Sequence, residues 1–296
     1  MVSRSRWSLP EARRGSRGRV SEANGFAAVC LILLAWRVHP DYPLVLAANR
    51  DEVHQRPAAP AAWWSSPHIL AGRDLSAGGT WLAVTPDGRF AALTNYRDPG
   101  RPRSDAPSRG ALPLRLLEPQ LPATLQLQQL QRIAGDYNGF NVLFSDGTQA
   151  AVFESVSGRG CLLEPGVYGL SNHLLDTPWP KVVTAKAALA AALTQLPEEH
   201  TLLELLRDDR PANDRELPRT GLTLEWERLL SSAFVRTPTY GTRCSTILLV
   251  DRHGQARFTE WTWNADGALS SQVNYDWTCG ETSETTASSA AADRTR

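Results

Sequence analysis

Short apolar runs separated by turn residues dominate the chain from Cys30 onward. Residues 30–36 and 44–48 are two such runs joined through a His-Pro-Asp turn, which predicts a β-hairpin. Turns that contain Asp and Gly predict three further hairpins, which join 81–84 to 90–93, 141–144 to 150–153, and 245–250 to 257–263. Such short connections are typical of antiparallel sheet.

Helical signals occupy other stretches of the chain. The helices that we expect are 125–133, 181–196, 200–207 and 224–232. Residues 98–112 are rich in Pro, Arg, Ser and Gly, and this composition predicts an exposed loop. Runs of strands with few helices between them indicate the α+β class.

The two ends of the chain differ in composition from the middle. Residues 1–28 contain six Arg against two Glu, which predicts disorder. An organellar transit peptide is a second interpretation, whereas a secretory signal is disfavoured because no apolar stretch is present. A third is that translation starts at Val29 on a GTG codon. We therefore divide the chain into a disordered or untranslated extension (1–29), a folded domain (30–278) and a disordered tail (279–296).

Charge and cysteine usage narrow the class of protein. Lys and Arg total 31 and Asp and Glu total 31, so the formal net charge is zero and no nucleic-acid partner is expected. No stretch approaches the roughly 20 apolar residues of a membrane-spanning helix. The four cysteines, Cys30, Cys161, Cys244 and Cys279, lack CxxC spacing, which favours a reducing compartment, taken as the cytoplasm. The oligomeric state is left open by these patterns.

The sequence contains none of the common nucleotide, zinc-protease or serine-hydrolase motifs, so no cofactor and no metal are expected. Clusters of polar residues instead follow the apolar strands. They occur at 49–52, 94–96, 137–141, 169–172 and 240–243. Each cluster alone is typical of an ordinary turn, but 49–52 (Asn-Arg-Asp-Glu) is four polar residues long, which is typical of a strand end that faces a cleft.

The order of these clusters after Cys30 resembles the NRDE family, also called the transport and Golgi organization protein 2 family. The resemblance covers about residues 29–263 and rests on Cys30 and the blocks 46–52, 56–57, 71–74, 78–82, 92–97, 137–141, 168–172 and 240–243. That family in turn resembles the cysteine N-terminal-nucleophile (Ntn) hydrolases of the penicillin V acylase and bile-salt hydrolase branch. The resemblance implies a four-layer αββα sandwich with mainly antiparallel sheets.

In that branch the catalytic cysteine is the first residue of the mature chain, and its own α-amine is the general base. Carried over, Cys30 is the nucleophile and Asp51 accepts hydrogen bonds from its α-ammonium group. Asn172 donates to the oxyanion with help from Asn95, and Arg243 lies beside the thiol and favours the thiolate.

One motif departs from the branch, which has Arg-Asn-x-Asp where this chain has Asn49, Arg50 and Asp51 in succession. Either Asn49 or Arg50 then takes the position of the arginine of the branch. Both are expected to contact substrate, together with Asn95 and Trp81.

The implied function is hydrolysis of a linear, non-peptide amide with an apolar acyl group. The alternative is a non-catalytic protein of the same fold that binds or carries acyl-CoA, another lipid or haem. Trp63, Trp64, Trp81 and Trp179 could line an apolar pocket for such a ligand, although tryptophans are as typical of packed cores. Cys30 also fits a small buried hydrophobic residue at a strand start, and an attached extension would convert its amine into an amide. A purely structural module is disfavoured because so many polar residues lie at strand ends.

Overall fold

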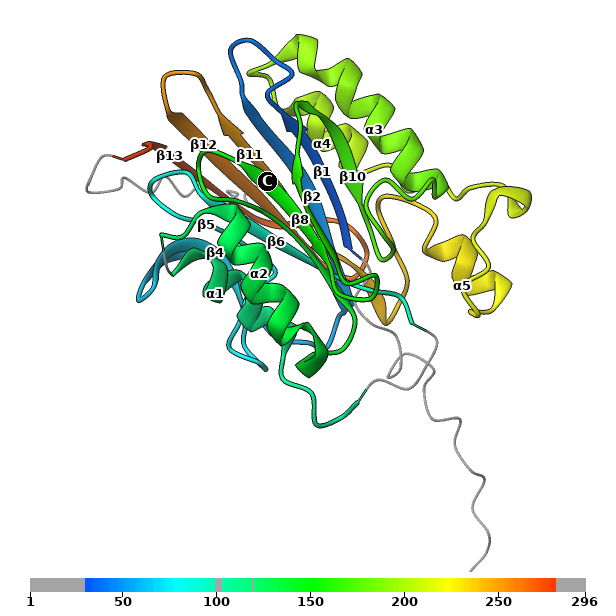
Figure 1. Ribbon diagram of the computed structural model, residues 1–296. Helices are drawn as coiled ribbons and strands as arrows, with labels where there is room; N and C mark the ends of the chain where they lie inside the picture. Colours follow the sequence, from blue (N-terminus) through cyan, green and yellow to red (C-terminus); the bar gives the residue numbers. More distant parts are fainter. Residues whose placement is uncertain (1–29, 99–102, 119, 281–296) are drawn as a thin grey trace, which may run out of the picture.

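The computed structural model describes residues 30–98, 103–118 and 120–280, which form two sheets stacked face to face (Figure 1). Sheet A has the spatial order β10 (Gly166–Leu170), β1 (Cys30–Trp36), β2 (Leu44–Val53), β11 (Tyr240–Val250), β12 (Gln255–Trp263) and β13 (Leu269–Thr278). Sheet B runs in chain order through β3 (Ala58–Ser65), β4 (His68–Asp74), β5 (Leu82–Val84), β6 (Phe90–Asn95), β7 (Phe140–Ser145), β8 (Ala150–Glu154) and β9 (Arg159–Leu163). Every pair of neighbouring strands is antiparallel.

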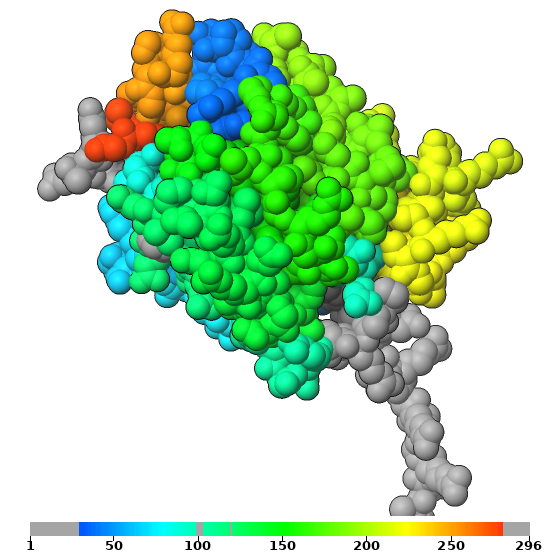
Figure 2. All heavy atoms as spheres, viewed as in Figure 1, coloured from blue at the N-terminus to red at the C-terminus, as the bar shows by residue number. Residues whose placement is uncertain are grey.

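Helices cover the outer face of each sheet (Figure 1). The α-helices are α1 (Leu112–Leu117), α2 (Ala123–Ile133), α3 (Pro180–Ala192), α4 (His200–Leu206) and α5 (Leu224–Leu229). The 3-10 turns are η2 (Arg109–Ala111), η3 (Ala134–Asp136), η4 (Leu193–Gln195) and η5 (Asp214–Glu216). Helices α3 and α4 pack on sheet A, α1 and α2 pack on sheet B, and the segment around α5 projects from one end, yellow in Figure 2.

The apolar run of β1 is continuous because both of its faces are buried. Ile32 and Leu34 point between the sheets, whereas Leu31 and Leu33 point toward α3 and α4. The molecule therefore has three apolar layers, one between the sheets and one beneath each pair of helices. The predicted α+β class with mainly antiparallel sheets is confirmed, and the layers are compatible with a sandwich.

The predicted exposed loop over 98–112 is wrong at its C-terminal end. Leu112 is fully buried and begins α1, whose Leu116 and Leu117 pack on sheet B with it. These apolar residues recur at i, i+4 and i+5, which places them on one face of a short helix. The preceding turn η2 is consequently held against the sheet.

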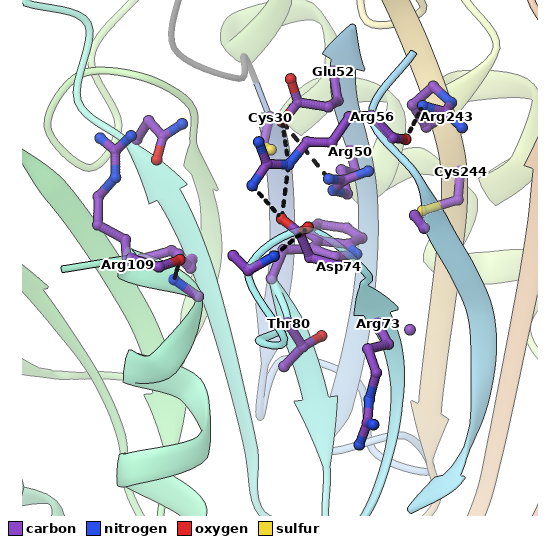
Figure 3. Close-up of a pocket in the computed structure, with 18 of the residues that line it drawn as sticks. Cys30, Arg50, Glu52, Arg56, Arg73, Asp74, Thr80, Arg109, Arg243 and Cys244 are labelled. Carbon is purple, nitrogen blue, oxygen red and sulfur yellow. Dashed lines mark hydrogen bonds and ion pairs between the residues drawn. The ribbon is translucent and has the colours of Figure 1, made fainter. Parts of the chain in front are cut away.

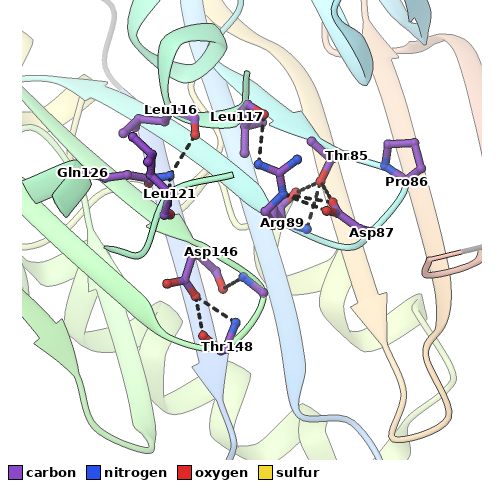
Figure 4. Close-up of polar contacts among 12 residues, drawn as sticks. Thr85, Pro86, Asp87, Arg89, Leu116, Leu117, Leu121, Gln126, Asp146 and Thr148 are labelled. Atoms are coloured by element: carbon purple, nitrogen blue, oxygen red, sulfur yellow. Dashed lines mark hydrogen bonds and ion pairs between the residues drawn. The ribbon is translucent and has the colours of Figure 1, made fainter. Parts of the chain in front are cut away.

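Buried polar contacts fix α1 in place (Figure 4). Arg89 forms an ion pair with Asp87 at 2.9 Å and donates to the carbonyl of Leu117 at 3.0 Å. Gln126 of α2 donates to the carbonyls of Leu116 and Leu121, each at 3.0 Å. The bonds to Leu116 and Leu117 satisfy carbonyls at the end of α1, where no intrahelical partner exists, and the bond to Leu121 holds the connection to α2.

The last described residues of the chain are hydrogen-bonded to the folded domain. Cys279 and Gly280, which composition assigns to the tail, donate backbone hydrogen bonds to Gly254 and Pro86 at 2.7 and 3.1 Å. The remaining tail, 281–296, and the extension 1–29 lie outside the described residues. Within the part of the chain that the structure covers, no helix has the length and hydrophobicity needed to cross a bilayer.

Candidate active site

A cavity of about 440 Å³ lies between the sheets, at the end where β1 begins (Figure 3). Cys30 is the first residue of β1 and pairs with Arg50 of β2 in the sheet register. The Cys30 side chain points between the sheets, as do those of Ile32 and Leu34 further along the strand. Trp81 and Leu93 of sheet B line the same cavity. Cys30 therefore lies where both sheets meet the cavity.

The Cys30 thiol is held in its neutral form. Burial raises its pKa to about 12, and the negative charge of Asp51 adds to this effect. A backbone hydrogen bond at Asp51 and the charge of Arg50 act in the opposite direction. Because the thiolate is the nucleophilic form, chemistry at Cys30 requires a base close to the sulfur.

Three strand ends join at Cys30. The Ser171 hydroxyl, just beyond β10, donates to the carbonyl of Cys30 at 2.9 Å. Asn172 follows, and its Nδ2 donates at 2.8 Å to the carbonyl of Asn95 at the end of β6. The backbone N–H of Arg97 donates to the carbonyl of Asn172 at 2.7 Å. These bonds bring Asn172 and Asn95, both predicted site residues, to the end of β1 and link the two sheets there.

Asp51 lies on the opposite face of β2, toward the helices, and is completely buried. The Thr242 hydroxyl donates to its Oδ1 at 2.6 Å, whereas Oδ2 has no hydrogen-bond partner among the described residues. Burial raises the pKa of Asp51, and the charge of Lys181 in α3 lowers it. Lys181 is buried as well, and its Nζ likewise lacks a partner in the described part of the chain.

The pairing of β1 with β2 shows on which side of Cys30 the residue Asp51 lies. Since Arg50 pairs with Cys30, Asp51 extends β2 one residue further, on the side of the Cys30 backbone nitrogen. The unpartnered oxygen of Asp51 thus belongs to the same end of β1 as that nitrogen. A hydrogen-bond donor there would remove the free-energy cost of a buried, unsatisfied carboxylate oxygen.

Asn49 and Arg50 occupy opposite faces of β2. Asn49 Nδ2 donates to the carbonyls of Leu206 and Ala233 at 2.7 and 2.8 Å, and its Oδ1 accepts from the Ser245 hydroxyl at 2.6 Å. Through these bonds Asn49 connects β2 to α4 and to the segment that contains Ala233, on the helix side of sheet A. Arg50 faces the cavity, so it is the residue of this pair that lines the space beside Cys30.

Arg243 occupies a β-bulge in β11 and also lines the cavity. Its NH1 donates to the carbonyls of Val53 and Arg56, each at 3.0 Å. The structure therefore directs this guanidinium to the end of β2, and the arginine opposite Cys30 is Arg50.

Of the four tryptophans considered for an apolar pocket, Trp81 lines this cavity and the others do not. Trp64 belongs to the layer beneath α1 and α2, and Trp179 to the layer beneath α3 and α4. Trp63 packs edge-on against Trp277 with ring centroids 5.4 Å apart. These three side chains serve the packing of the fold.

The cavity holds charged residues to which the sequence analysis assigned no individual role. They are Glu52, Arg56, Asp74, Arg109 and Glu260. Glu52 could have been found, because period-two alternation in β2 places it on the same face as Arg50. Arg109 and Glu260 carry no local signal, since they reach the cavity only through the packing of distant segments.

Comparison with known proteins agrees with the sequence resemblance. The profile of the transport and Golgi organisation 2 family matches residues 29–265. The chain belongs to this family. A transport and Golgi organization 2 homolog of Mus musculus is 35% identical over 256 residues, and its counterpart in Bos taurus is 36% identical over 257 residues. Each alignment covers 78% of this chain and 92% of the relative. The Drosophila melanogaster family member is 29% identical over 263 residues.

Proposed function

We propose that this protein is a cysteine Ntn hydrolase of αββα fold that cleaves a linear, non-peptide amide, with Cys30 as the N-terminal nucleophile. One observation carries the proposal. The first residue of a central strand presents a thiol to a cavity, and a buried carboxylate oxygen of Asp51 without a partner among the described residues lies on the side of its backbone nitrogen. An α-ammonium group at Cys30 supplies the donor that this oxygen lacks.

The base in this proposal is the α-amine of Cys30. A free α-amine has a pKa of about 7.7 to 8, whereas burial raises that of the Cys30 thiol to about 12. The proton therefore remains on sulfur at rest, and the neutral amine takes it as sulfur attacks the carbonyl carbon. Asp51 orients the resulting ammonium and balances its charge.

The reaction then proceeds in two halves. Attack forms the S–C bond and a tetrahedral oxyanion, for which we assign Asn172 and Asn95 as donors. The hydrogen bond between these two residues holds the Asn172 side chain in one orientation. The ammonium protonates the leaving amine as the C–N bond breaks, which leaves a thioester on Cys30. Water then attacks the thioester and gives its proton to the amine. The C–S bond breaks to release the acid, and the ammonium returns the proton to the leaving sulfur.

The test compares the full chain with a chain released from a fusion so that Cys30 is its first residue. We expect the second form to become acylated on Cys30 by N-acyl and thioester probes, as measured by intact mass, and to turn over N-acyl amides. The full chain lacks the free amine and should be slower by about 10² to 10⁴, the usual contribution of a general base. Cys30→Ala should abolish both signals, whereas Cys161→Ala on the exposed strand β9 should leave them unchanged.

The same preparations decide against the proposal if it is wrong. A protein that forms no adduct with a broad probe panel, but binds acyl-CoA or haem equally well in the wild type and in the Cys30→Ala variant, is a carrier. The charged lining of the cavity gives that alternative some basis, because both ligands carry anionic groups. In that case the thiol has no chemical role.

A further inference from the structure

The cavity beside Cys30 carries more positive than negative charge. Arg50, Arg56, Arg109 and Arg243 line it, against Glu52, Asp74 and Glu260. Burial also raises the pKa of Glu260, which favours its neutral form. The guanidinium of Arg73 stacks on the ring of Trp64 at 3.8 Å, and Trp64 belongs to the layer beneath α1 and α2. Arg73 also lines the cavity, but its guanidinium is engaged with that ring.

The four cavity arginines differ in how their charge is balanced. Arg56 forms an ion pair with Asp74 at 2.8 Å, and Arg50 lies 3.6 Å from Glu52. Arg109 and Arg243 form no ion pair with any acidic side chain in the described ranges. The two described hydrogen bonds of Arg243 already connect it to the ends of β2. Arg109 is the cation that most lacks a counter-charge.

Arg109 is held firmly although it lacks that partner. Its NH1 donates to the carbonyl of Gly139 at 2.9 Å. The turn that carries it is locked against sheet B, because Gly79 and Gly110 approach so closely that a Cβ on Gly79 would lie 2.4 Å from the Gly110 carbonyl oxygen. Figure 3 shows Arg109 at the wall of the cavity next to α1, on the side opposite Arg50 and Glu52.

The environment of Arg109 makes an unbalanced charge costly. Burial lowers its pKa to about 10, and negative charge on Cys30, when its thiol ionises, and on Glu52 acts in the opposite direction. A cation removed from water without an anion loses solvation free energy that a bound anion restores. A rigid guanidinium is also suited to carboxylate or phosphate, which it can bind through two parallel hydrogen bonds.

We propose that Arg109 is the anion-binding residue of this cavity and that the ligand carries a carboxylate or phosphate group next to an apolar segment. Trp81 and Leu93 provide the apolar wall for that segment. The further statement that this anion lies near the cleaved bond rests on the proposed hydrolase function, because it requires Cys30 to attack the same ligand. Binding of the anion by Arg109 does not depend on that assumption.

The test measures binding to the full chain by titration calorimetry, so it requires no free amine at Cys30. N-octanoylglycine and N-octanoylglycinamide differ only in the carboxylate, and N-octanoyl-phosphoethanolamine replaces it with phosphate. We expect the wild type to bind at least one anionic probe about tenfold or more tightly than the neutral amide, with a preference that weakens at high salt. The phosphate probe decides which anion is preferred.

Three variants locate the effect. Arg109→Gln should remove the preference for the anionic probe while leaving the affinity for the neutral amide unchanged, and Arg109→Lys should retain part of it. Arg159→Gln, on the exposed strand β9, should behave as wild type. Circular dichroism and the retained neutral binding show that the variants fold.

Equal affinity for charged and neutral probes overturns the proposal, as does a preference that survives Arg109→Gln. Absence of binding by both anionic probes at about 1 mM overturns it too, since a specific subsite binds more tightly than that. If no acyl adduct forms on Cys30 but the preference persists, the hydrolase proposal fails and the anion site stands.

Discussion

Adjacent residues of β2 belong to two different environments. On the face toward the cavity, Arg50 and Glu52 are separated by 3.6 Å, and Glu52 also lies 3.8 Å from Arg56, which is partly exposed. On the face toward the helices, Asn49 and Asp51 are fully buried, and their hydrogen bonds measure 2.6 to 2.8 Å. Buried hydrogen bonds therefore fix the strand on its helix face, whereas the charged side chains on its cavity face are only loosely paired.

This difference suits a binding site. Side chains that hold a reacting group in position are most effective when their own partners are buried and short. Charges that must receive a ligand are better paired weakly, because a strong internal ion pair would compete with the ligand. One face of β2 thus holds the site in position, and the other face is available to bind a ligand. Single substitutions on each face can test this difference.

The largest effect is expected on the helix face, from Asn49→Ala. This change removes the amide donor from the buried carbonyls of Leu206 and Ala233 and the acceptor from the Ser245 hydroxyl, which keeps only the bond that it accepts from Trp263. We expect a loss of about 3 kcal/mol in the free energy of unfolding, measured by urea denaturation. A loss below about 1 kcal/mol would show that water or rearrangement replaces these bonds, and that this face is not rigid.

A second prediction compares a carboxylate on the helix face of β2 with one that lines the cavity, through the pH dependence of stability. Asp51 has a raised pKa, so the folded protein keeps its proton to a higher pH than the unfolded chain does. The free energy of unfolding therefore falls as pH rises through that window, by about 1.4 kcal/mol for each pKa unit of difference. Asp51→Asn should make this fall shallower.

Asp74 lines the same cavity from the end of β4 in the other sheet, and it provides the control of opposite sign. Burial acts to raise its pKa, but hydrogen bonds from Arg56 and from backbone N–H groups outweigh this and lower it. Its stabilising effect is present above the ordinary pKa of Asp and is lost as pH falls through the lowered value. Asp74→Asn should thus remove stability near neutral pH and flatten the acid limb. Identical pH profiles for the two variants would contradict the contrast between the buried helix side of β2 and the cavity lining.

The smallest effect is expected from Glu52→Gln on the cavity face. The variant removes only ion pairs of 3.6 and 3.8 Å, and such pairs contribute about 0 to 1 kcal/mol. Stability in urea should change by less than about 1 kcal/mol. A loss of unfolding free energy as large as that expected for Asn49→Ala would mean that the cavity face of β2 is held as firmly as its helix face.

Much of the strand pattern could be predicted from local sequence. Turns with Asp and Gly placed the hairpins β5–β6, β7–β8 and β11–β12, because turn chemistry depends on adjacent residues. The edge strand β3 was missed because Ala and Pro fill its first half, and proline is tolerated only where no ladder hydrogen bond is needed. Helix α1 was missed because the composition before it resembles a loop.

The site was predictable only in part, for the same reason. The run 49–52 marks the end of an apolar strand, so Arg50 and Asp51 could be selected as candidates. Nothing local indicates that Lys181 is buried beside Asp51 or that Arg109 enters the cavity. Both depend on tertiary packing of helices and turns that lie far from β2 in the chain.

The strand order of the two sheets has a consequence for the timing of folding. Sheet B forms from neighbours in the chain, but β2 of sheet A pairs with β11, and Thr242 and Asp51 are 191 residues apart. Closing so long a loop is slow, and a lone β1–β2 hairpin is only marginally stable. During synthesis the start of β1 should therefore stay accessible to processing enzymes until β11 has left the ribosome. An aminopeptidase would have nearly the whole translation time to act before Asp51 is enclosed.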